Sequence, residues 1–493
     1  MKIKTFIKNN WILLIILVIG LFMRVFNARE LFYYSHDNDL AGWFVRDVVV
    51  NKHLRLIGQE TSTQGIFIGP IYYYLLIPFY LMFNMDPFGG VVLITILGML
   101  SILSIYFVFK EIFDTKVGLI ASFIYSISFY TVFNDREVVP TMPVIAWSVW
   151  FLYAVNKILK GDQKIGYVIA GILLGLIWHL NMTLILLIPL LFLAQYMSGK
   201  KIKKTNLKGF FTPIFILTLP LILFEVRHGF SQVKWFYRSM TTDQYAIVVG
   251  YEKFVQVIHL NAKNITGLVW GNLVSVNYEL LFYVFLIIFF FLIIQKVIPK
   301  KLSIILLVWI SVYFTFFTVY SKNVSEYYLN GLIVIWLLVL SLFFYALLKT
   351  KIYVFCGVIL IAIFSMINIY RFFKIPINRS GYLYRRAIVA EIKNNANIHR
   401  YPCVSISYIT KPGYNLGYRY LFFLENMHVN TPKSGSPVYT IVYPLREDIS
   451  VNVTNGSIGL IYPDYEQYNM DDVSKSCTGD NANTTEPMWG FTN

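Results

Sequence analysis

Long apolar runs, separated by short polar or basic segments, constrain the fold of this chain more than any other feature. A helix that crosses a bilayer needs about 20 mostly apolar residues. Eleven suitable runs lie at 11–27, 89–109, 117–133, 138–159, 165–180, 182–198, 209–224, 278–297, 302–320, 328–348 and 351–371. Because 57% of the residues are hydrophobic and only 14% are charged, a soluble globular protein is excluded. We predict an all-α polytopic membrane protein with about 11 transmembrane helices.

A twelfth apolar run, 66–83, is assigned to the membrane surface. It contains helix-breaking and aromatic residues that suit an interfacial or half-inserted helix: Gly69, Pro70, Pro78 and the triplet Tyr72-Tyr73-Tyr74. With this run left out of the count, the basic segments at 110–116, 157–164, 200–208, 296–301 and 349–351 all fall on one side. The positive-inside rule makes that side the cytoplasm. We therefore expect a multi-pass plasma-membrane protein with a cytoplasmic N-terminus.

The composition changes after residue 375, which predicts two domains. Residues 1–375 form the transmembrane domain, with a long first outer loop at 28–88. Residues 376–493 contain short β-like runs at 403–409, 438–443 and 457–462 and a helical stretch near 384–395. This pattern favours a small α+β extracytoplasmic domain, whose last residues, about 25 of them, are polar enough to be disordered.

Charge and cysteine content limit the partners of the chain. The formal net charge is +16, but the Lys and Arg residues are scattered among many loops. Topology and anionic lipid headgroups explain them better than a nucleic acid does. Cys403 and Cys477 lie in the C-terminal region and can form a disulfide if that region is outside the cytosol. No Cys/His spacing suggests a zinc site.

The first outer loop opens with a pair of acidic residues, Asp37 and Asp39, followed by Arg46 and Asp47 on a predicted short amphipathic helix. Carboxylates at a membrane face are costly to hold near hydrocarbon and point to function. Two nearby carboxylates can serve as a general base, a metal site or both. The structural alternative is that Asp39 caps the helix.

A second charged motif, with Arg136 and Glu137, follows the third predicted span. Arginine suits bidentate contact with phosphate, and a neighbouring glutamate can orient it or join the acidic site. The alternative is an arginine that snorkels to the interface and forms a local salt bridge.

Other polar residues fall at the same predicted face of the membrane. His179 and Asn181 lie in the turn between two spans, and Arg227 and His228 lie at a helix end; each is a candidate substrate or phosphate contact or a satisfied interfacial residue. Before the tenth span, Lys322 is a candidate phosphate contact, and the aromatic residues Tyr327 and Tyr328 can stack on a sugar or form part of an aromatic belt.

The order of these motifs resembles the GT-C membrane glycosyltransferases. One span precedes a long outer loop that opens with an Asp motif, then Gly69-Pro70-Ile71-Tyr72-Tyr73-Tyr74, and then a charged motif after the third span. The block from Gly171 to Pro189 and the pair Tyr327-Tyr328 also resemble the protein O-mannosyltransferase-like (family 39) branch, which includes the aminoarabinose lipid A transferase. The resemblance covers roughly residues 10–375.

The resemblance implies a polyprenyl-phosphate sugar donor, a hydroxyl-bearing acceptor (protein, lipid or envelope glycan) and transfer on the outer face, usually with inversion. Asp37 matches the position of the family's first-loop Asp, which is thought to activate the acceptor. Arg136 and Glu137 match its second charged loop. A developing phosphate charge also needs nearby cations, for which Arg136, His179 and Lys322 are candidates.

Two departures from the family pattern leave questions open. The lysine common in related enzymes at the turn after the fifth span is Asn181 here, and the first-loop motif is Asp-Asn-Asp rather than Asp-Glu. The phosphate contacts and the use of a divalent cation, with Asp37, Asp39 and Glu137 as candidate ligands, therefore stay open. The alternatives are a lipid-linked sugar flippase or transporter, and an O-antigen ligase or polymerase, which usually relies on Arg and His in a large late loop such as 225–277.

Overall fold

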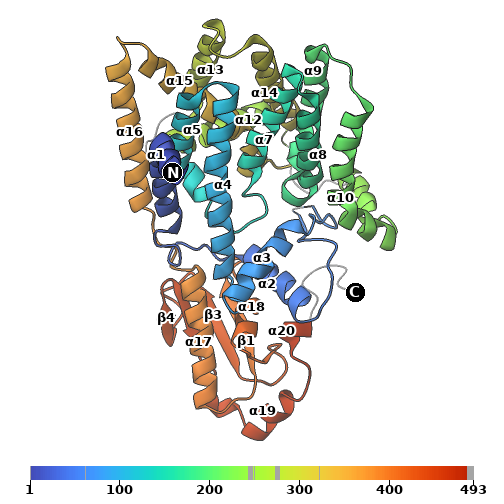
Figure 1. Ribbon diagram of the computed structural model, residues 1–493. Helices are drawn as coiled ribbons and strands as arrows, with labels where there is room; N and C mark the ends of the chain where they lie inside the picture. The colour runs from blue at the N-terminus through green and yellow to red at the C-terminus, as the bar shows by residue number, and fades with distance from the viewer. Residues whose placement is uncertain are drawn as a thin grey trace.

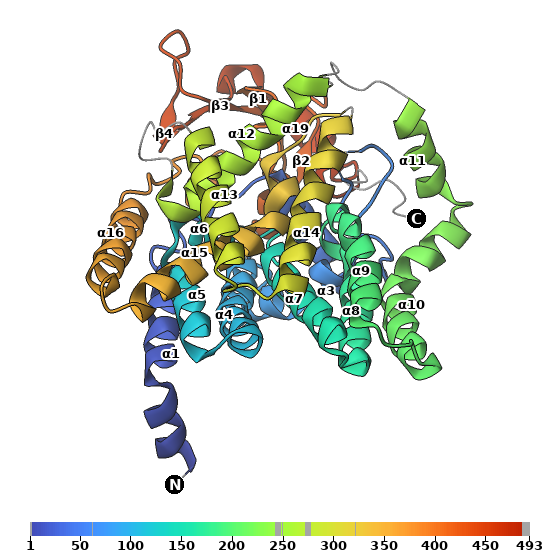
Figure 2. The ribbon, with the colours of Figure 1, turned by 90° about the horizontal axis from the view of Figure 1, so that it is seen from above.

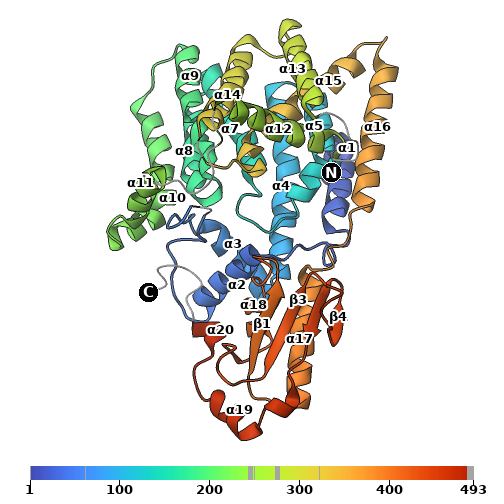
Figure 3. The same cartoon turned by 180° about the vertical axis from the view of Figure 1, so that it is seen from behind.

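A bundle of long helices and a smaller mixed part follow one another along the long axis of the molecule (Figure 1). The computed structural model describes residues 2–61, 63–241, 248, 250–271, 278–320 and 322–485. Helices α2 and α3 lie between the bundle and the smaller part, as Figures 1 and 3 both show. The predicted architecture, a polytopic helical domain with a small C-terminal α+β part, is confirmed.

Each of the eleven predicted spans contains an apolar helix. The bundle helices are α1 (Lys2–Val25), α4 (Phe88–Ile112), α5 (Thr115–Ile127), α6 (Phe129–Asn134), α7 (Val144–Lys160), α8 (Gln163–Leu180), η1 (Met182–Leu187), α9 (Ile188–Ser198), α10 (Lys204–Arg227), α13 (Tyr278–Ile294), α14 (Lys300–Val319), η3 (Glu326–Leu332), α15 (Ile333–Lys349) and α16 (Val354–Phe373). Among the described residues, six helices are long and apolar enough by themselves to cross a membrane, and others, such as α5 and α13, are shorter apolar helices.

Two boundaries differ from the prediction for local reasons. The run 117–133 is interrupted at Ser128, whose extended backbone (φ −57°, ψ 127°) separates α5 from α6. The run 138–159 becomes helical only at Val144, because Pro140 and Pro143 precede it and proline disfavours a helical conformation in the residue before it. Residues 135–143 therefore form an irregular loop at this end of the bundle.

Other helices come from segments between the predicted spans. They are the short helices α2 (His36–Val49), α3 (Ile71–Met82) and α11 (Ser231–Thr241), and the 20-residue helix α12 (Gly250–Val269). The run 66–83, assigned to the membrane surface, contributes only the 12-residue helix α3, which is too short to span a bilayer. Helix α12 packs against α6, α14, α15 and η3, so the loop 225–277 is partly built into the bundle.

The C-terminal part is a five-stranded sheet with helices. Its elements are α17 (Tyr382–Ile398), β1 (Val404–Thr410), α18 (Arg419–Leu424), β2 (Val429–Asn430), β3 (Val438–Tyr443), β4 (Val453–Asn455), β5 (Ile458–Ile461), η4 (Tyr465–Gln467), α19 (Met470–Ser476) and α20 (Ala482–Thr485). The strand order is β2-β1-β3-β5-β4. Strand β1 runs parallel to β2 and β3, and β5 runs antiparallel to β3 and β4.

The two cysteines of the C-terminal part form a disulfide between Cys403, just before β1, and Cys477, just after α19. Part of the stretch expected to be disordered is therefore folded, since it carries α19, α20 and this crosslink. The rest of that stretch, 486–493, lies outside the described residues.

One hydrophobic core joins α2 and α3 to the C-terminal part. It contains Phe44 and Trp43 from α2, Tyr73 from α3, and Tyr420 and Ile441 from the C-terminal part. A second, larger core fills the helical bundle. Because the segment 28–88 shares a core with the C-terminal part, the position of its acidic residues depends on that packing.

Candidate functional site

Asp37 lies in the first turn of α2. The helix begins after Ser35, whose backbone N–H donates to Asn38 Oδ1 at 2.9 Å, so Ser35 and Asn38 form the helix cap. The Asp37 side chain is half-buried and accepts a hydrogen bond from Gln59 Nε2 at 3.4 Å. Burial raises the pKa of the Asp37 carboxyl, and the adjacent His36 and Gln59 offset part of that rise. A raised pKa makes this carboxylate a stronger base than an ordinary aspartate.

Asp39 has a different environment, although it is only two residues away. Its side chain is 0% exposed, and its Oδ1 accepts from the Tyr420 backbone N–H at 3.0 Å and from the Tyr34 hydroxyl at 3.2 Å. Burial raises the pKa of Asp39 to about 6. The alternative in which Asp39 caps the helix is wrong, since Ser35 and Asn38 form the cap. The carboxylate binds the C-terminal part and does not line an open site.

Asn38, between the two acids, brings the second charged loop to the first. Its side chain is 2% exposed, and its Nδ2 donates to the Val138 carbonyl at 2.9 Å. This bond holds residue 138, and with it Glu137, against the start of α2. The pKa of Glu137 is raised to about 7, first by burial and then by the negative charge of Asp37. The negative charge of Asp37 therefore favours the protonated form of Glu137.

Glu137 lines a cavity of about 730 Å³ at this end of the bundle. The Glu137 side chain is exposed within the cavity. Protein atoms surround it there, and this burial raises its pKa. The walls come from α6, the 135–143 loop, α12 and η3. The lining residues are Phe129, Tyr130, Phe133, Asn134, Glu137, Leu260, Lys263, Asn264, Gly267, Gly271, Val324, Ser325, Glu326, Tyr327 and Asn330.

Polar and charged groups gather on the α12 and η3 side of this cavity. Lys263 forms an ion pair with Glu326, Asn264 Nδ2 donates to the Glu326 carbonyl at 3.3 Å, and the Tyr130 hydroxyl donates to Asn330 Oδ1 at 2.8 Å. Aromatic rings line the remaining wall, Tyr327 among them. A cavity with aromatic faces and a few convergent polar groups suits a polar ligand of moderate size, such as a sugar.

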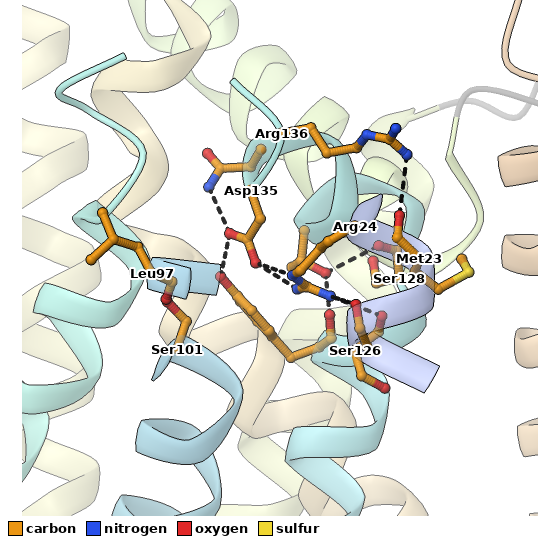
Figure 4. Close-up of polar contacts among 12 residues, drawn as sticks. Met23, Arg24, Leu97, Ser101, Ser126, Ser128, Asp135 and Arg136 are labelled. Carbon is orange, nitrogen blue, oxygen red and sulfur yellow. Dashed lines mark hydrogen bonds and ion pairs between the residues drawn. The ribbon is translucent and has the colours of Figure 1, made fainter. Parts of the chain in front are cut away.

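The Arg136 guanidinium is bound to the end of the first helix. Its Nη1 donates to the Met23 carbonyl at 3.1 Å (Figure 4). Its Nη2 donates to the Phe26 carbonyl at 2.6 Å, and the group lies over the Phe372 ring. These contacts satisfy carbonyls that a helix end leaves free. Arg136 therefore binds backbone carbonyls, and we do not assign it a contact with phosphate.

The neighbouring Asp135 forms a buried ion pair with Arg24, and both side chains are 0% exposed (Figure 4). Arg24 Nε donates to Asp135 Oδ2 at 2.9 Å, and the Tyr125 hydroxyl donates to Oδ1 at 2.8 Å. Arg24 also donates to the carbonyls of Gly20 and Ser126. This pair links α1 to the loop that carries Glu137.

His179 and Asn181 are engaged in the fold. The His179 ring is 0% exposed, with Nε2 at 2.8 Å from the Leu217 carbonyl and Nδ1 accepting from the Ile71 N–H at 3.4 Å. It packs so tightly on Gly69 that a Cβ there would come within 2.0 Å of Nδ1, which explains why this position is glycine. Asn181 Oδ1 caps η1 by accepting from the Thr183 N–H at 3.0 Å.

Arg227 and His228 lie at the end of α10 and line a small groove with residues 53–57 of the first loop. Arg227 is exposed, and His228 stacks on Phe224. Two of the lining residues pair with Asp47 of α2, His53 at 2.9 Å and Arg55 at 2.7 Å. We call His53, Arg55, Arg227 and His228 the basic groove. The groove contains two arginines, Arg55, which pairs with Asp47, and Arg227.

The segment 322–328, before the tenth predicted span, contacts α12, the cavity and the bundle core through different residues. Ser321 lies outside the described residues. The Lys322 carbonyl accepts from Lys253 Nζ at 2.8 Å, which attaches this segment to α12. Tyr327 faces the cavity, whereas Tyr328 stacks on Phe317 within the bundle. Among the described residues, no group of three or more His, Cys, Asp or Glu side chains gathers in a way that could hold a metal ion.

Some residues that shape the site carried no signal in the sequence. Gln59 and Lys263 are polar residues of ordinary types, and only their tertiary partners distinguish them. Asp135 was part of the recognised charged motif, but its partner Arg24 lies 111 residues away in the first span. A charged residue inside an apolar run is a functional or structural signal, so Arg24 could also have been detected from the sequence.

Comparison with known proteins agrees with this architecture. Residues 68–226 match the model of a family described as dolichyl-phosphate-mannose-protein mannosyltransferase. No curated protein sequence matches the chain. Two structures of ArnT from Cupriavidus metallidurans, in the apo state and bound to undecaprenyl phosphate, are similar in fold, with TM-scores of 0.62 and 0.61 at 10% identity. The alignments cover 94% and 93% of this chain and 99% of each ArnT chain.

A structure of the Archaeoglobus fulgidus oligosaccharyltransferase, in complex with Zn and sulfate, has a TM-score of 0.50 at 13% identity. That alignment covers 87% of this chain and 67% of the oligosaccharyltransferase chain. The predicted resemblance to the GT-C membrane glycosyltransferases is confirmed, and the chain has the GT-C fold.

Proposed function

We propose that this protein is an integral membrane glycosyltransferase that moves a sugar from a polyprenyl-phosphate-linked donor to a hydroxyl acceptor on the outer face of the membrane. The observation that carries the proposal is the position of Glu137, which lines a cavity of about 730 Å³ and lies next to Val138, whose carbonyl binds Asn38 beside Asp37. The GT-C fold and the match over residues 68–226 to a mannosyltransferase family support the reaction class.

Asp37 acts as the general base in this proposal. Its carboxylate takes the proton of the acceptor hydroxyl while the acceptor oxygen attacks the anomeric carbon. The bond from that carbon to the phosphate oxygen breaks, and the polyprenyl phosphate leaves as an anion. Glu137 and Tyr327 line the cavity, where the aromatic face of Tyr327 contacts a sugar. Attack opposite the leaving phosphate inverts the anomeric centre.

The basic groove holds the donor phosphate in this proposal. The first-loop segment that lines it, 53–57, ends two residues before Gln59, which donates to Asp37. Cations offset the charge that develops on a leaving phosphate. The groove adjoins α10, whose outward side chains Phe215, Ile216 and Val226 are exposed and apolar. Figure 2 shows α10 at one edge of the bundle, where a prenyl chain in lipid can reach it.

Two independent features support the outer face as the location of the site. The Cys403–Cys477 disulfide is typical of a compartment outside the reducing cytosol. The most basic loops lie on the opposite side of the predicted spans from the acidic loop. The domain boundary near residue 375, between the transmembrane and extracytoplasmic domains, belongs to the same proposal.

The other function classes receive less support. An O-antigen ligase or polymerase usually relies on Arg and His residues that act together in a late loop. Here His259 pairs with Glu279 at 2.8 Å, and Arg238 stacks on Trp235, so these residues of the loop do not form one site. A flippase or transporter is not favoured by the GT-C fold.

Sugar transfer by the purified protein tests the proposal. A panel of undecaprenyl-phosphate sugars that carry radiolabelled mannose, glucose, galactose or aminoarabinose is incubated with the protein and a cell-envelope extract, with and without EDTA. Asp37→Asn is expected to lower transfer about 100-fold or more, as loss of a general base does. Loss of transfer with EDTA alone would indicate a divalent cation.

The matched control is Asp448→Asn, at an exposed carboxylate that pairs only with Arg446 on the surface. It is expected to keep full transfer. If Asp37→Asn turns over normally in a folded protein, Asp37 is not the base. If no donor in the panel is consumed by the unaltered protein, the polyprenyl-phosphate donor class is wrong.

A further inference from the structure

The helix that carries Asp37 is held from the side of the C-terminal part. Asp39 is 0% exposed, and its Oδ1 accepts from the Tyr420 backbone N–H at 3.0 Å, across 381 residues of sequence. The Tyr34 hydroxyl donates to the same oxygen at 3.2 Å. A buried carboxylate that accepts a backbone N–H from another domain fixes the separation of the two elements more tightly than apolar packing does.

Side chains on the next turn of α2 interlock with α18. The ring of Trp43 contacts the rings of Tyr420 and Phe423 at centroid distances of 6.0 and 5.7 Å. A Cβ at Gly42 would come within 2.6 Å of the Tyr420 ring, so this glycine permits the close approach. Arg419, on α18, lies over the outer face of Trp43.

A second attachment holds the C-terminal part independently. Asp86, just before α4, forms an ion pair with Arg386 on α17, and the Tyr382 hydroxyl donates to Asp86 at 2.6 Å. Loss of the Asp39 contact therefore leaves the C-terminal part attached to the bundle. What changes is the orientation of α2.

We propose that Asp39 is a positioning residue through which the C-terminal part sets the orientation of α2 and thereby aims Asp37 at the acceptor. The inference rests on the proposed function for the role of Asp37. Asp37 and Asp39 are about 200° apart around the helix axis, because each residue advances about 100°. One acid therefore faces the site while the other faces α18. The C-terminal part is then a component of the transferase and not an appended module.

The test compares Asp39→Asn with Asp39→Ala in the full-length protein. Asparagine keeps an oxygen that accepts the Tyr420 N–H, whereas alanine removes it. For Asp39→Ala, we expect kcat for transfer from the best undecaprenyl-phosphate sugar to fall about tenfold to a hundredfold, as for an ångström-scale misplacement of a reacting group. The KM for that donor should stay the same. Asp39→Asn should keep most of the transfer.

Gly42→Ala provides a second variant that leaves the carboxylate in place. Alanine favours the helix itself, but its Cβ displaces the Tyr420 ring. It should lower kcat in the same way and speed amide hydrogen exchange in peptides that cover residues 36–49. Gly479→Ala is the matched control, since a Cβ at Gly479 meets open space. That control should change neither transfer nor exchange.

The outcomes separate this inference from the proposed function. If Asp39→Asn is as inactive as Asp37→Asn, Asp39 acts in the chemistry and the positioning role is wrong. The role is also wrong if Asp39→Ala and Gly42→Ala both keep full kcat. If Asp39→Ala does not fold, Gly42→Ala decides alone. Normal turnover by Asp37→Asn would refute the base assignment, while altered exchange in α2 would still report the coupling to the C-terminal part.

Discussion

The side chains of three consecutive residues, Asp37, Asn38 and Asp39, contact three different segments of the protein. Asp37 accepts a hydrogen bond from Gln59, and its charge helps to raise the pKa of Glu137. Asn38 binds the Val138 carbonyl, and Asp39 binds the Tyr420 backbone. Successive residues on a helix point about 100° apart, so an acidic motif does not imply that its acids share a site. The Asp-Asn-Asp sequence is one candidate base followed by two structural contacts.

Asp39 should make the stability of the protein depend on pH. Burial raises its pKa from 3.8 to about 6 in the folded state, so the folded state binds the proton more tightly than the unfolded chain does. Stability from this group is present at low pH and is lost as the pH rises from about 4 to about 6. A shift of about two units corresponds to roughly 3 kcal/mol at most.

Asp39→Asn removes the free-energy cost of burying a charged carboxylate, and it keeps an oxygen that accepts from the Tyr420 N–H. Its thermal midpoint in detergent should exceed that of the unaltered protein at pH 7.5, and the difference should shrink towards pH 4.5. Thermal unfolding measured across this pH range checks the expectation. A difference that does not vary with pH would show that the desolvated charge of Asp39 is not its source.

At the scale of elements, the break between α5 and α6 shapes the cavity wall. The break exposes the Phe129 N–H, which donates to Asn368 Oδ1 at 2.8 Å, and the Ser128 hydroxyl donates to the Leu268 carbonyl at 2.8 Å. Asn368 Nδ2 in turn donates to the Val269 carbonyl at 2.7 Å. One buried side chain on α16 thus joins α6 and α12, two of the cavity walls.

Asn368→Ala should therefore destabilise the protein. It leaves the Phe129 N–H and the Val269 carbonyl without this partner, and an unsatisfied buried group costs about 1–3 kcal/mol. The thermal midpoint in detergent should fall clearly. Ser365→Ala, one turn away on the same helix, removes only a bond to the Ile361 carbonyl of that helix and should change the midpoint little. Equal effects of the two variants would contradict the bridging role.

At the scale of the whole molecule, the proposed orientation places the C-terminal part outside the cytosol. Asp448→Cys and Lys164→Cys, made separately with Cys356→Ser, introduce thiols at exposed positions of the C-terminal part and of a basic loop. A membrane-impermeant maleimide should label the cysteine at position 448 in intact cells. It should label the cysteine at position 164 only after permeabilisation. The reverse pattern would invert the topology and move the site to the cytoplasmic face.

Sequence alone predicted much of the fold but less of the site. The eleven apolar runs, the short helix within 66–83 and the α+β pattern after residue 375 all appear in the structure, because hydropathy and turn residues act locally along the chain. Of the candidate site residues, Glu137 and Tyr327 line the cavity. Arg136, His179 and Asn181 bind backbone groups instead. Their residue types suit either role, and only their neighbours decide between the two.

The sequence by itself determined that this is a polytopic helical membrane protein and where its polar segments fall along the chain. An apolar run of spanning length is a property of about 20 neighbouring residues. Such runs, and the basic loops between them, can therefore be recognised without knowing how the rest of the chain folds. Only the tertiary structure decided that Asn38 meets Val138, that Asp39 meets Tyr420, and that Lys263 meets Glu326 at the cavity wall. Contacts between distant segments depend on how helices pack side by side, which hydropathy does not encode.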